Sequence, residues 1–368
     1  KKNGHSSVFV SIIRQKRFKR SKKSLIEAKS TMVQRKRKME KFAEKMAKDI
    51  KGADIPETVK QKLLKNLLQM KDKKINILIT GATGCGKSST INALFDADVA
   101  KVGVGVDPET MDIQKFDLED GLTLWDSPGL GDGKEADNRH AKNIIKKLNE
   151  LGPDGKPLID LVLVILDGSS RDLGTSYELI NDVVIPSLHK DKRRILVAIN
   201  QADVAMKGRY WNHEENRPEP QLEEFLNQKV ASVKARIKEG TGLDVEPIYY
   251  SAGYKDGDEL QGRPYNLSKL LYYIISCTPR EKRAIYADNI NRDSEMWQDD
   301  DELKDYRKGI LDSIVDSVSE GASVGGELGE TIGGIFGSKG RAVGKAVGTV
   351  AGAVVGAVKG FFGGIFGW

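Results

Sequence analysis

The chain has 368 residues, which is enough for one large α/β domain with flanking segments. Its formal net charge of +6 is unevenly distributed, because residues 1–50 hold 17 Lys and Arg against 4 Asp and Glu, while the remaining residues hold 42 against 49. The two cysteines, Cys85 and Cys277, are too few and too far apart for a disulfide framework or a zinc site, which favours a reducing cytoplasm.

The basic N-terminal arm has two competing interpretations. It suits an anionic lipid surface or a nucleic acid, and it equally suits a solvated helix with no fixed partner. The apolar run 8–13 is too short for the core of a secretory signal and leads into basic residues. Since the chain starts with Lys1 rather than Met, residues before Met32 or Met39 are treated as an extension and carry little weight.

Two helices are predicted within a basic helical region, residues 1–72. Residues 24–50 are compatible with a very basic helix. A second helix is expected to begin at Pro56, because proline suits the first helical position. Its apolar residues recur on one face, which we expect to pack on the rest of the chain or on a second copy: Val59, Leu63, Leu64, Leu67 and Leu68.

Residues 73–278 alternate between apolar strands and helical patterns. The predicted strands include 75–79, 158–166, 195–199 and 247–250, and the predicted helices include 222–238 and 267–276. Such alternation predicts an α/β fold with a mostly parallel, six-stranded sheet and helices on both faces. Residues 111–118 and 121–125 are expected to form a hairpin, the one antiparallel addition to that sheet.

The first chemical motif follows the strand at 75–79 and precedes a helical pattern at 89–95. Residues 81–88 fit G-x-x-x-x-G-K-[ST], a loop whose backbone N–H groups close around phosphates at the positive end of a helix. Lys87 is expected to reach the β- and γ-phosphates, and Ser88 to bind Mg²⁺. The predicted phosphate-binding residues are Gly81, Thr83, Gly84, Cys85, Gly86, Lys87, Ser88 and Ser89.

Three further motifs each follow a predicted strand, at the edge where open α/β sheets bind ligands. They are Asp126-Ser127-Pro128-Gly129, Asn200-Gln201-Ala202-Asp203 and Ser251-Ala252. Together with the first motif, in this order, the set resembles the Era-like and septin-like P-loop GTPases over residues 73–278. The resemblance implies a GTPase domain that binds GTP and GDP with Mg²⁺.

The resemblance also implies roles for the later motifs. Asp126 would hold Mg²⁺ through water, and the N–H of Gly129 would meet the γ-phosphate. Thr110, the only threonine between Thr90 and Thr123, is the candidate that closes over Mg²⁺ and the γ-phosphate; the alternative is an ordinary loop threonine. The base would be read by Asp203, whose carboxylate accepts guanine N–H groups, with help from Asn200, Gln201, Ser251 and Ala252.

The chain departs from the family pattern at three positions. Gln201 stands where the family has Lys, and its shorter aliphatic part covers the base only partly. Leu130 follows Gly129 where many GTPases carry a Gln that orients water. Gly84 occupies the place of an Asn that holds potassium in some relatives, so potassium activation is not expected. We therefore expect slow intrinsic turnover, raised by a partner or by a homodimer through the GTPase domain.

Three basic residues are candidates for charges that a homodimer could offer across to the second copy. They are Arg139, His140 and Arg171. A solvated surface position is the competing and more common explanation for each of them.

The C-terminal part divides into a charged helical stalk, 279–320, and a glycine-rich tail, 321–368. Glycine recurs every fourth residue at 321–337 and again at 340–364, a glycine-zipper-like stripe that permits close helix packing. Residues 346–368 are long enough to cross a bilayer, at the cost of Lys359. The tail is expected to associate with membrane lipid, which would place a cytoplasmic protein at the inner face of a membrane; the alternative is a flexible or self-associating tail.

Three functions are compatible with the sequence. The first is a GTP-hydrolysing molecular switch that is membrane-associated through its tail. The second is a septin-like assembly or scaffold module in which GTP is a structural ligand with little turnover. The third is an Era-like RNA- or ribosome-associated GTPase, which ranks last because no suitable G-x-x-G segment follows the GTPase domain.

Overall fold

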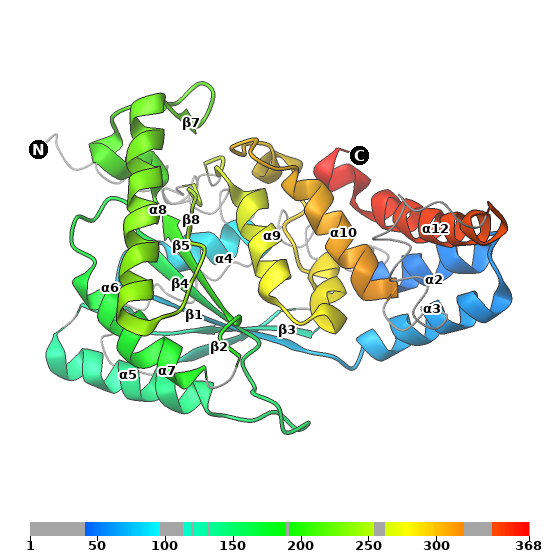
Figure 1. The fold of residues 1–368 in the computed structure, drawn as a ribbon, viewed down its shortest axis with the longest axis horizontal. Coiled ribbons are helices and arrows are strands. Elements are labelled where there is room, and N and C mark those ends of the chain that lie inside the picture. The colour runs from blue at the N-terminus through cyan, green and yellow to red at the C-terminus, as the bar shows by residue number, and fades with distance from the viewer. Residues whose placement is uncertain are drawn as a thin grey trace, which may run out of the picture. The chain divides into compact units, whose positions relative to one another are not determined.

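The computed structural model describes residues 41–95, 113–118, 121–131, 133–188, 191–253, 262–319 and 341–367 (Figure 1). The chain divides into two compact units, Lys1–Lys45 and Met46–Trp368. Most of the first unit, including residues 24–40 of the predicted basic helix at 24–50, lies outside the described residues, and residues 42–50 of that prediction are helical. Thr110, residues 321–340 of the glycine-rich tail and Trp368 also lie outside the described residues.

The centre of the second unit is a six-stranded sheet with the order β2-β3-β1-β4-β5-β8. The strands are β1 (Ile75–Gly81), β2 (Gln114–Asp117), β3 (Leu122–Asp126), β4 (Leu161–Asp167), β5 (Ile195–Asn200) and β8 (Ile248–Tyr249). All neighbours pair in parallel except β2, which runs antiparallel to β3. The predicted mostly parallel sheet, with its one hairpin, is confirmed.

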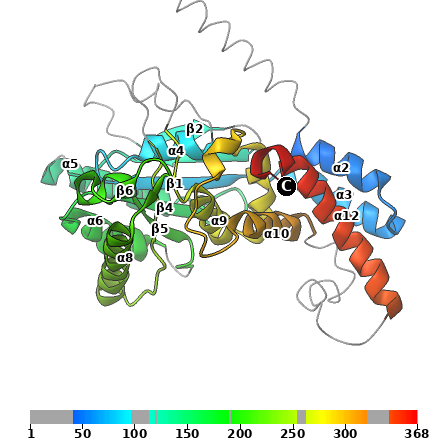
Figure 2. The same cartoon turned by 90° about the horizontal axis from the view of Figure 1, so that it is seen from above.

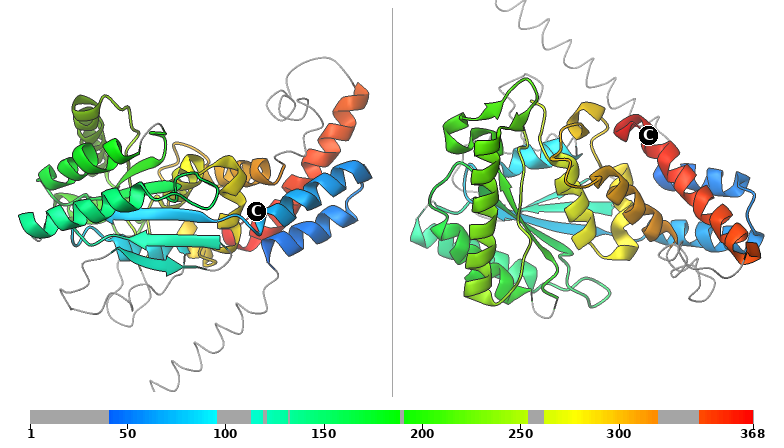
Figure 3. Two further views of the ribbon diagram at one scale, coloured as in Figure 1. Left: turned by 90° about the horizontal axis from the view of Figure 1, so that it is seen from below. Right: turned by 45° about the horizontal axis from the view of Figure 1, so that its top comes forward.

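Helices cover both faces of the sheet, as predicted (Figures 2 and 3). Strands β1, β4 and β5 are buried on both sides because their residues are almost all aliphatic. One face packs on α5 (Lys134–Leu148), on α8 (Pro220–Thr241) and on a continuous helical stretch made of α6 (Gly174–Glu178), the π-helix η3 (Leu179–Val184) and α7 (Ile185–Ser187). The other face packs on α4 (Lys87–Phe95) and α9 (Leu267–Cys277).

The N-terminal helices agree with the sequence in part. They are α2 (Phe42–Gly52) and α3 (Glu57–Met70), and Pro56 lies one residue before α3, at its N-cap. The buried face of α3 is formed by Val59, Leu63, Leu67 and Met70. Leu68 was expected on this face but is 65% exposed, because it lies about 100° round the helix from Leu67.

Two short elements follow β5 that the sequence did not indicate. The 3₁₀ segment η4 (Ala202–Gly208) leads into a two-stranded hairpin of β6 (Trp211–Asn212) and β7 (Arg217–Pro218). Trp211 is buried and contacts the ring of Tyr265 edge-to-face at 5.4 Å. The hairpin is therefore anchored beside the segment that follows Ser251-Ala252.

Residues after α9 form further helices that pack back on the second unit. These are η5 (Arg280–Asp288), η6 (Ser294–Trp297), α10 (Tyr306–Ser319) and α12 (Arg341–Phe366). Helix α10 lies beside α9, α3 and α12 (Figure 1). None of the described helices has the length and hydropathy that a bilayer-spanning segment needs.

Helix α12 buries its larger side chains and leaves its glycines outside. Val354, Val358 and Phe362 are buried, and Phe366 meets the ring of Trp297 at 5.6 Å. Gly352, Gly356, Gly360 and Gly364 are exposed, and no described atom lies within 4 Å of a Cβ added at 352, 356 or 364. Glycine-zipper packing of the tail thus stays a prediction, because the described stripe faces open space.

Asp300 supports the start of α9 from a distant part of the chain. Its Oδ1 accepts the backbone N–H of Lys269 at 3.3 Å. Burial raises the pKa of Asp300 to about 6, although a hydrogen bond from Ser268 partly lowers it. The ionised carboxylate is thus less favourable in the folded protein than in the unfolded chain, so stability should fall as pH rises from about 4 to about 6.

We expect Asp300→Asn to stabilise the protein at neutral pH, because an amide oxygen still accepts the Lys269 N–H without the cost of a buried charge. Its gain in free energy of unfolding should be about 2 kcal/mol larger at pH 7.5 than at pH 4.5. Urea unfolding at both pH values measures this difference. The exposed Glu302→Gln serves as control, and an equal gain at both pH values would show that burial of the charge is not the cause.

Candidate functional site

The predicted motifs meet at the carboxyl edge of the sheet, around β1. The chain order reverses there, since β3 lies on one side of β1 and β4 on the other. Ile79 of β1 is opposite Asp126 of β3, and Asp167 of β4 is opposite Asn200 of β5. A crevice at such a reversal point is where open α/β sheets bind ligands.

Residues 81–87 form a tight loop between the body of β1 and α4, which is called the phosphate-type loop below. Lys87 Nζ donates to the carbonyl oxygens of Gly81 and Ala82, at 3.2 Å each, so the ammonium lies over the loop. The first turn of α4 follows immediately, and its backbone N–H groups point into the loop. This arrangement concentrates positive potential at one point on the sheet edge, which suits a phosphate group.

Gly86 is one position of this loop where a side chain does not fit. Its φ is +88°, which L-residues rarely adopt, and a Cβ built there would lie 2.2 Å from Asn200 Nδ2. The amide of Asn200 therefore occupies the space that a larger residue at 86 would need. The loop from β1 and the end of β5 fit together only through this glycine.

Asp126 has the environment expected of a metal-binding carboxylate. Its Oδ1 is buried and has no hydrogen-bond partner among the residues that the structure describes. Burial raises its pKa to about 6, and the charge of Lys87 lowers it in part. An orphaned carboxylate oxygen beside a phosphate-type loop fits a hard divalent cation such as Mg²⁺, which prefers oxygen ligands. Ser88, the other predicted ligand of this cation, is the second residue of α4.

The segment after Asp126 continues across to the phosphate-type loop. Leu130 N–H donates to Gly81 O at 3.4 Å, and Thr83 N–H donates to Leu130 O at 3.1 Å. Gly129 lies so close to Thr83 that an added Cβ would be 2.2 Å from Thr83 Oγ1. The Leu130 side chain is only 6% exposed and belongs to the core under α5. It therefore points away from any water at the site.

Asn200 joins the other two motifs. The side chain is 2% exposed, its Nδ2 donates to Cys85 O at 2.9 Å, and its Oδ1 accepts the N–H of Ala252 at 3.0 Å. One amide thus fastens the phosphate-type loop to the loop after β8. Gln201, with a left-handed φ of 62°, adds a second tie by donating from Nε2 to Gly84 O at 2.8 Å.

Asp203 and Ser251 are also in contact. Ser251 Oγ donates to Asp203 Oδ1 at 2.6 Å, and the backbone of Ser251 exchanges two hydrogen bonds with Tyr265. The carboxylate is thereby held at the end of the sheet next to the Ala252 N–H. The second oxygen of this carboxylate is an acceptor suited to the N–H groups of a guanine base, whereas the N–H of Ala252 donates to Asn200 Oδ1 in this structure.

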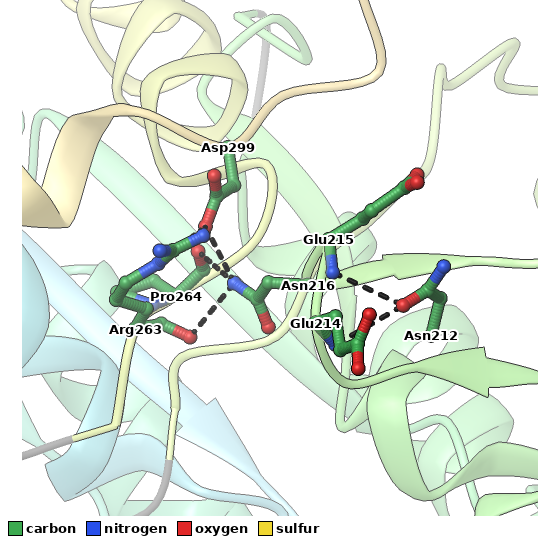
Figure 4. A network of polar contacts seen from close by, with 7 residues as sticks. All are labelled: Asn212, Glu214, Glu215, Asn216, Arg263, Pro264 and Asp299. Atoms are coloured by element: carbon green, nitrogen blue, oxygen red, sulfur yellow. Dashed lines mark hydrogen bonds and ion pairs between the residues drawn. The ribbon is translucent and has the colours of Figure 1, made fainter.

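A polar network braces this end of the site (Figure 4). Asn216 Nδ2 donates to the carbonyl oxygens of Arg263 and Pro264 and to Asp299 Oδ2, at 3.2, 3.1 and 2.7 Å. Arg263 donates to the same carboxylate oxygen through Nε and Nη2. The β6–β7 hairpin, the segment after Ser251-Ala252 and the loop before α10 are therefore held together by one carboxylate.

The described site residues all lie around this edge. Those in the loop after β1 and the start of α4 are Gly81, Thr83, Gly84, Cys85, Gly86, Lys87, Ser88 and Ser89. Those at or after the ends of β3, β5 and β8 are Asp126, Gly129, Asn200, Gln201, Asp203, Ser251 and Ala252. Thr110 lies outside the described residues, so its predicted role stays a prediction.

Two contacts were not predicted from the sequence. His140 was considered for a partner across a dimer, but it is 3% exposed and its Nδ1 bonds to Gly129 O at 3.2 Å. Its spacing of four residues from Ile144 on α5 could have indicated burial. The hydroxyls of Tyr250 and Thr90 lie 2.7 Å apart and join the residue after β8 to α4; a Tyr at the end of a strand gives no comparable signal.

Fold and site together define the chain's class: it has the α/β fold of the P-loop GTPases, with a candidate nucleotide site at the carboxyl edge of the sheet. Residues 76–201 match the family described as 50S ribosome-binding GTPase. That match covers β1 to the start of the Asn200 motif, and so includes three of the four motifs in whole or in part.

The chain is also similar to individual proteins. It is 34% identical over 156 residues to the uncharacterised protein YkfA of Escherichia coli K12, covering 42% of this chain and 50% of that protein. It is 34% identical over 106 residues to translocase of chloroplast 125 of Physcomitrium patens, covering 28% and 9%. A crystal structure of a dimerization-deficient mutant of Toc33 from Arabidopsis thaliana has 18% identity and a TM-score of 0.37 over 61% of this chain and 93% of that one.

The chain spans about half the length of the E. coli relatives that it matches, since YfjP, at 30% identity over 154 residues, is also covered to 50%.

Proposed function

We propose that the protein is a molecular switch that hydrolyses GTP to GDP and phosphate. The observation that supports this most is the double contact of Asn200, which joins the phosphate-type loop at Cys85 to the base-reading loop at Ala252. A single ligand with a polyphosphate at one end and a guanine at the other spans these two loops. Asp203 reads the base, and Lys87 neutralises the phosphates.

Mg²⁺ completes the site in this proposal. Ser88 and Asp126 would hold the ion, with Thr110 as the residue that would close over it, and the ion would supply charge stabilisation to the phosphates. The orphaned, buried oxygen of Asp126 supports its part in this site. Gly129 contributes its backbone N–H to the γ-phosphate, next to Thr83.

Slow intrinsic turnover follows from Leu130. Its side chain is packed in the core, so it neither orients nor activates the attacking water. We propose that the chain forms a homodimer through the GTPase domain, in which the second copy supplies a positive charge to the site. Arg139 and Arg171 are exposed and remain candidates, whereas His140 is occupied by Gly129 within its own chain.

A phosphate-release assay under multiple turnover tests the proposal. GTP should be hydrolysed slowly at low protein concentration, with a specific activity that rises with concentration if dimers form. Arg171→Ala should abolish this increase in specific activity and leave the rate at low protein concentration unchanged. Nucleotide binding without turnover at any concentration would support the septin-like scaffold instead, a candidate that the burial of Leu130 favours.

We further propose that the protein acts in the cytoplasm and reaches the inner face of a membrane through residues 321–368. Since Val354, Val358 and Phe362 of α12 are packed inside the protein, lipid contact requires this helix to leave α10 and η6. Liposome flotation with GDP and with a GTP analogue, for the full chain and for a variant without 321–368, tests this. If neither form floats with either nucleotide, the membrane proposal is wrong.

Ribosome association is the remaining proposal, and it has the least support. It rests on the description of the matched family and on the basic N-terminal arm. Salt-dependent co-sedimentation with ribosomes would support it. If the full chain is absent from the ribosomal pellet even at low salt, the proposal is wrong.

A further inference from the structure

The segment Gly129–Gly131 is fastened to one face of α5. His140 Nδ1 lies 3.2 Å from Gly129 O, and Asp137 Oδ1 accepts the N–H of Gly131 at 2.9 Å. A carbonyl oxygen can only accept, so Nδ1 of His140 carries the hydrogen and donates it. Residues 137 and 140 are three apart and therefore neighbours on the helix surface. Two donor–acceptor pairs thus fix both ends of a three-residue segment.

The same segment touches the phosphate-type loop from its other side. Thr83 N–H donates to Leu130 O, and the Cα of Gly129 lies against the backbone of Thr83. The Gly129 peptide is therefore held between α5 and Thr83. Glycine has no side chain that restricts its ψ, so the direction of its carbonyl depends on the group that donates a hydrogen bond to it.

We infer that His140 is the positioning residue that orients the Gly129 peptide for contact with the γ-phosphate. The inference rests on the proposed function, in which the Gly129 N–H meets that phosphate. The imidazole holds the peptide that joins Gly129 to Leu130, with its carbonyl toward α5 and its N–H, that of Leu130, toward Gly81 O at 3.4 Å. This anchor limits the position of the Gly129 Cα and so of the N–H that the residue carries. The segment then needs no reorganisation when the triphosphate arrives.

A purely structural role is the competing explanation. His140 lies on the buried face of α5 with Ile144 and Leu148, and buried polar side chains usually need a hydrogen bond wherever they are. The two explanations differ in what a substitution changes. Loss of packing lowers stability without regard to the nucleotide, whereas loss of orientation weakens only ligands that carry a γ-phosphate.

The decisive comparison is between His140→Asn and His140→Gln. The amide nitrogen of Asn occupies nearly the position of Nδ1 and can still donate to Gly129 O, whereas the amide of Gln extends to the position of Nε2 and cannot. Affinities for GDP and for a non-hydrolysable GTP analogue, together with kcat and KM for GTP, are measured for both variants, for His140→Ala and for Lys142→Ala, an exposed control on the same helix.

We expect His140→Gln and His140→Ala to lose about tenfold in affinity for the GTP analogue and about tenfold in kcat, with GDP affinity changed by less than about twofold. His140→Asn should retain most of both properties, and Lys142→Ala should match the parent in nucleotide affinity and in kcat. If His140→Ala does not fold, Asp137→Ala at its half-buried surface position should give a smaller shift in the same direction.

Equal losses for GDP and the GTP analogue, or identical behaviour of His140→Asn and His140→Gln, would overturn the inference and leave the proposed function intact. Failure of the parent protein to bind any guanine nucleotide would instead contradict the proposed function, and the inference with it.

Discussion

Gly86→Ala is expected to lower the affinity for both GTP and GDP by at least about 100-fold. The added methyl group would lie 2.2 Å from the amide of Asn200, at a φ of +88° that alanine disfavours. The loop must therefore shift, or Asn200 must leave Cys85 and Ala252, and either change separates the two halves of the site. Isothermal titration with each nucleotide in the presence of Mg²⁺ measures the loss.

Gly242→Ala is the matched control for this substitution. Gly242 ends α8 with a φ of +72°, so alanine is strained there to a similar degree, but no described atom lies within 4 Å of the added Cβ. It should cost about 1 kcal/mol of stability and leave nucleotide affinity unchanged. If both variants bind nucleotide like the parent, the contact between Gly86 and Asn200 does not shape the site.

Lys87→Ala should remove at least about 100-fold of the affinity for GTP, because two effects act together. The ammonium that faces the phosphates is lost. The charge of Lys87 also lowers the raised pKa of Asp126, so without it a larger fraction of this carboxyl is protonated and unable to hold Mg²⁺. The effect should therefore be greater at pH 6 than at pH 8, where Asp126 is ionised even without the lysine.

The pH dependence separates this explanation from a simple loss of one contact. Affinity for GTP with saturating Mg²⁺ is measured at pH 6 and at pH 8 for Lys87→Ala and for Lys134→Ala, an exposed lysine at the start of α5. The control should resemble the parent protein at both pH values. A loss of less than about fivefold in Lys87→Ala would show that this lysine does not contact the phosphates.

The sheet and the convergence of the motifs could be predicted because each motif directly follows a strand. Parallel strands end at the same edge, so Gly81, Asp126, Asn200 and Ser251 had to meet once the strands were correctly identified. Hydrophobic runs such as Ile75–Ile79 identify a fully buried strand without any knowledge of its neighbours.

Features that depend on distant parts of the chain could not be predicted. The contact of His140 with Gly129 and the network of Asn216, Arg263 and Asp299 join segments whose meeting is set by packing of whole helices and loops. Periodicity indicated a glycine stripe along the tail. It could not indicate that the Val and Phe side chains of α12 would pack within the same unit.

The central claim is that Asp203, held by Ser251, selects guanine. It is tested most directly by competing GTP and ATP for the parent protein and for Asp203→Asn, which keeps an oxygen for the Ser251 hydroxyl but replaces the second acceptor by a donor. The parent should prefer GTP by at least about 100-fold, and the variant should lose most of that preference through weaker GTP binding. Equal affinity of the parent protein for GTP and ATP would contradict the assignment.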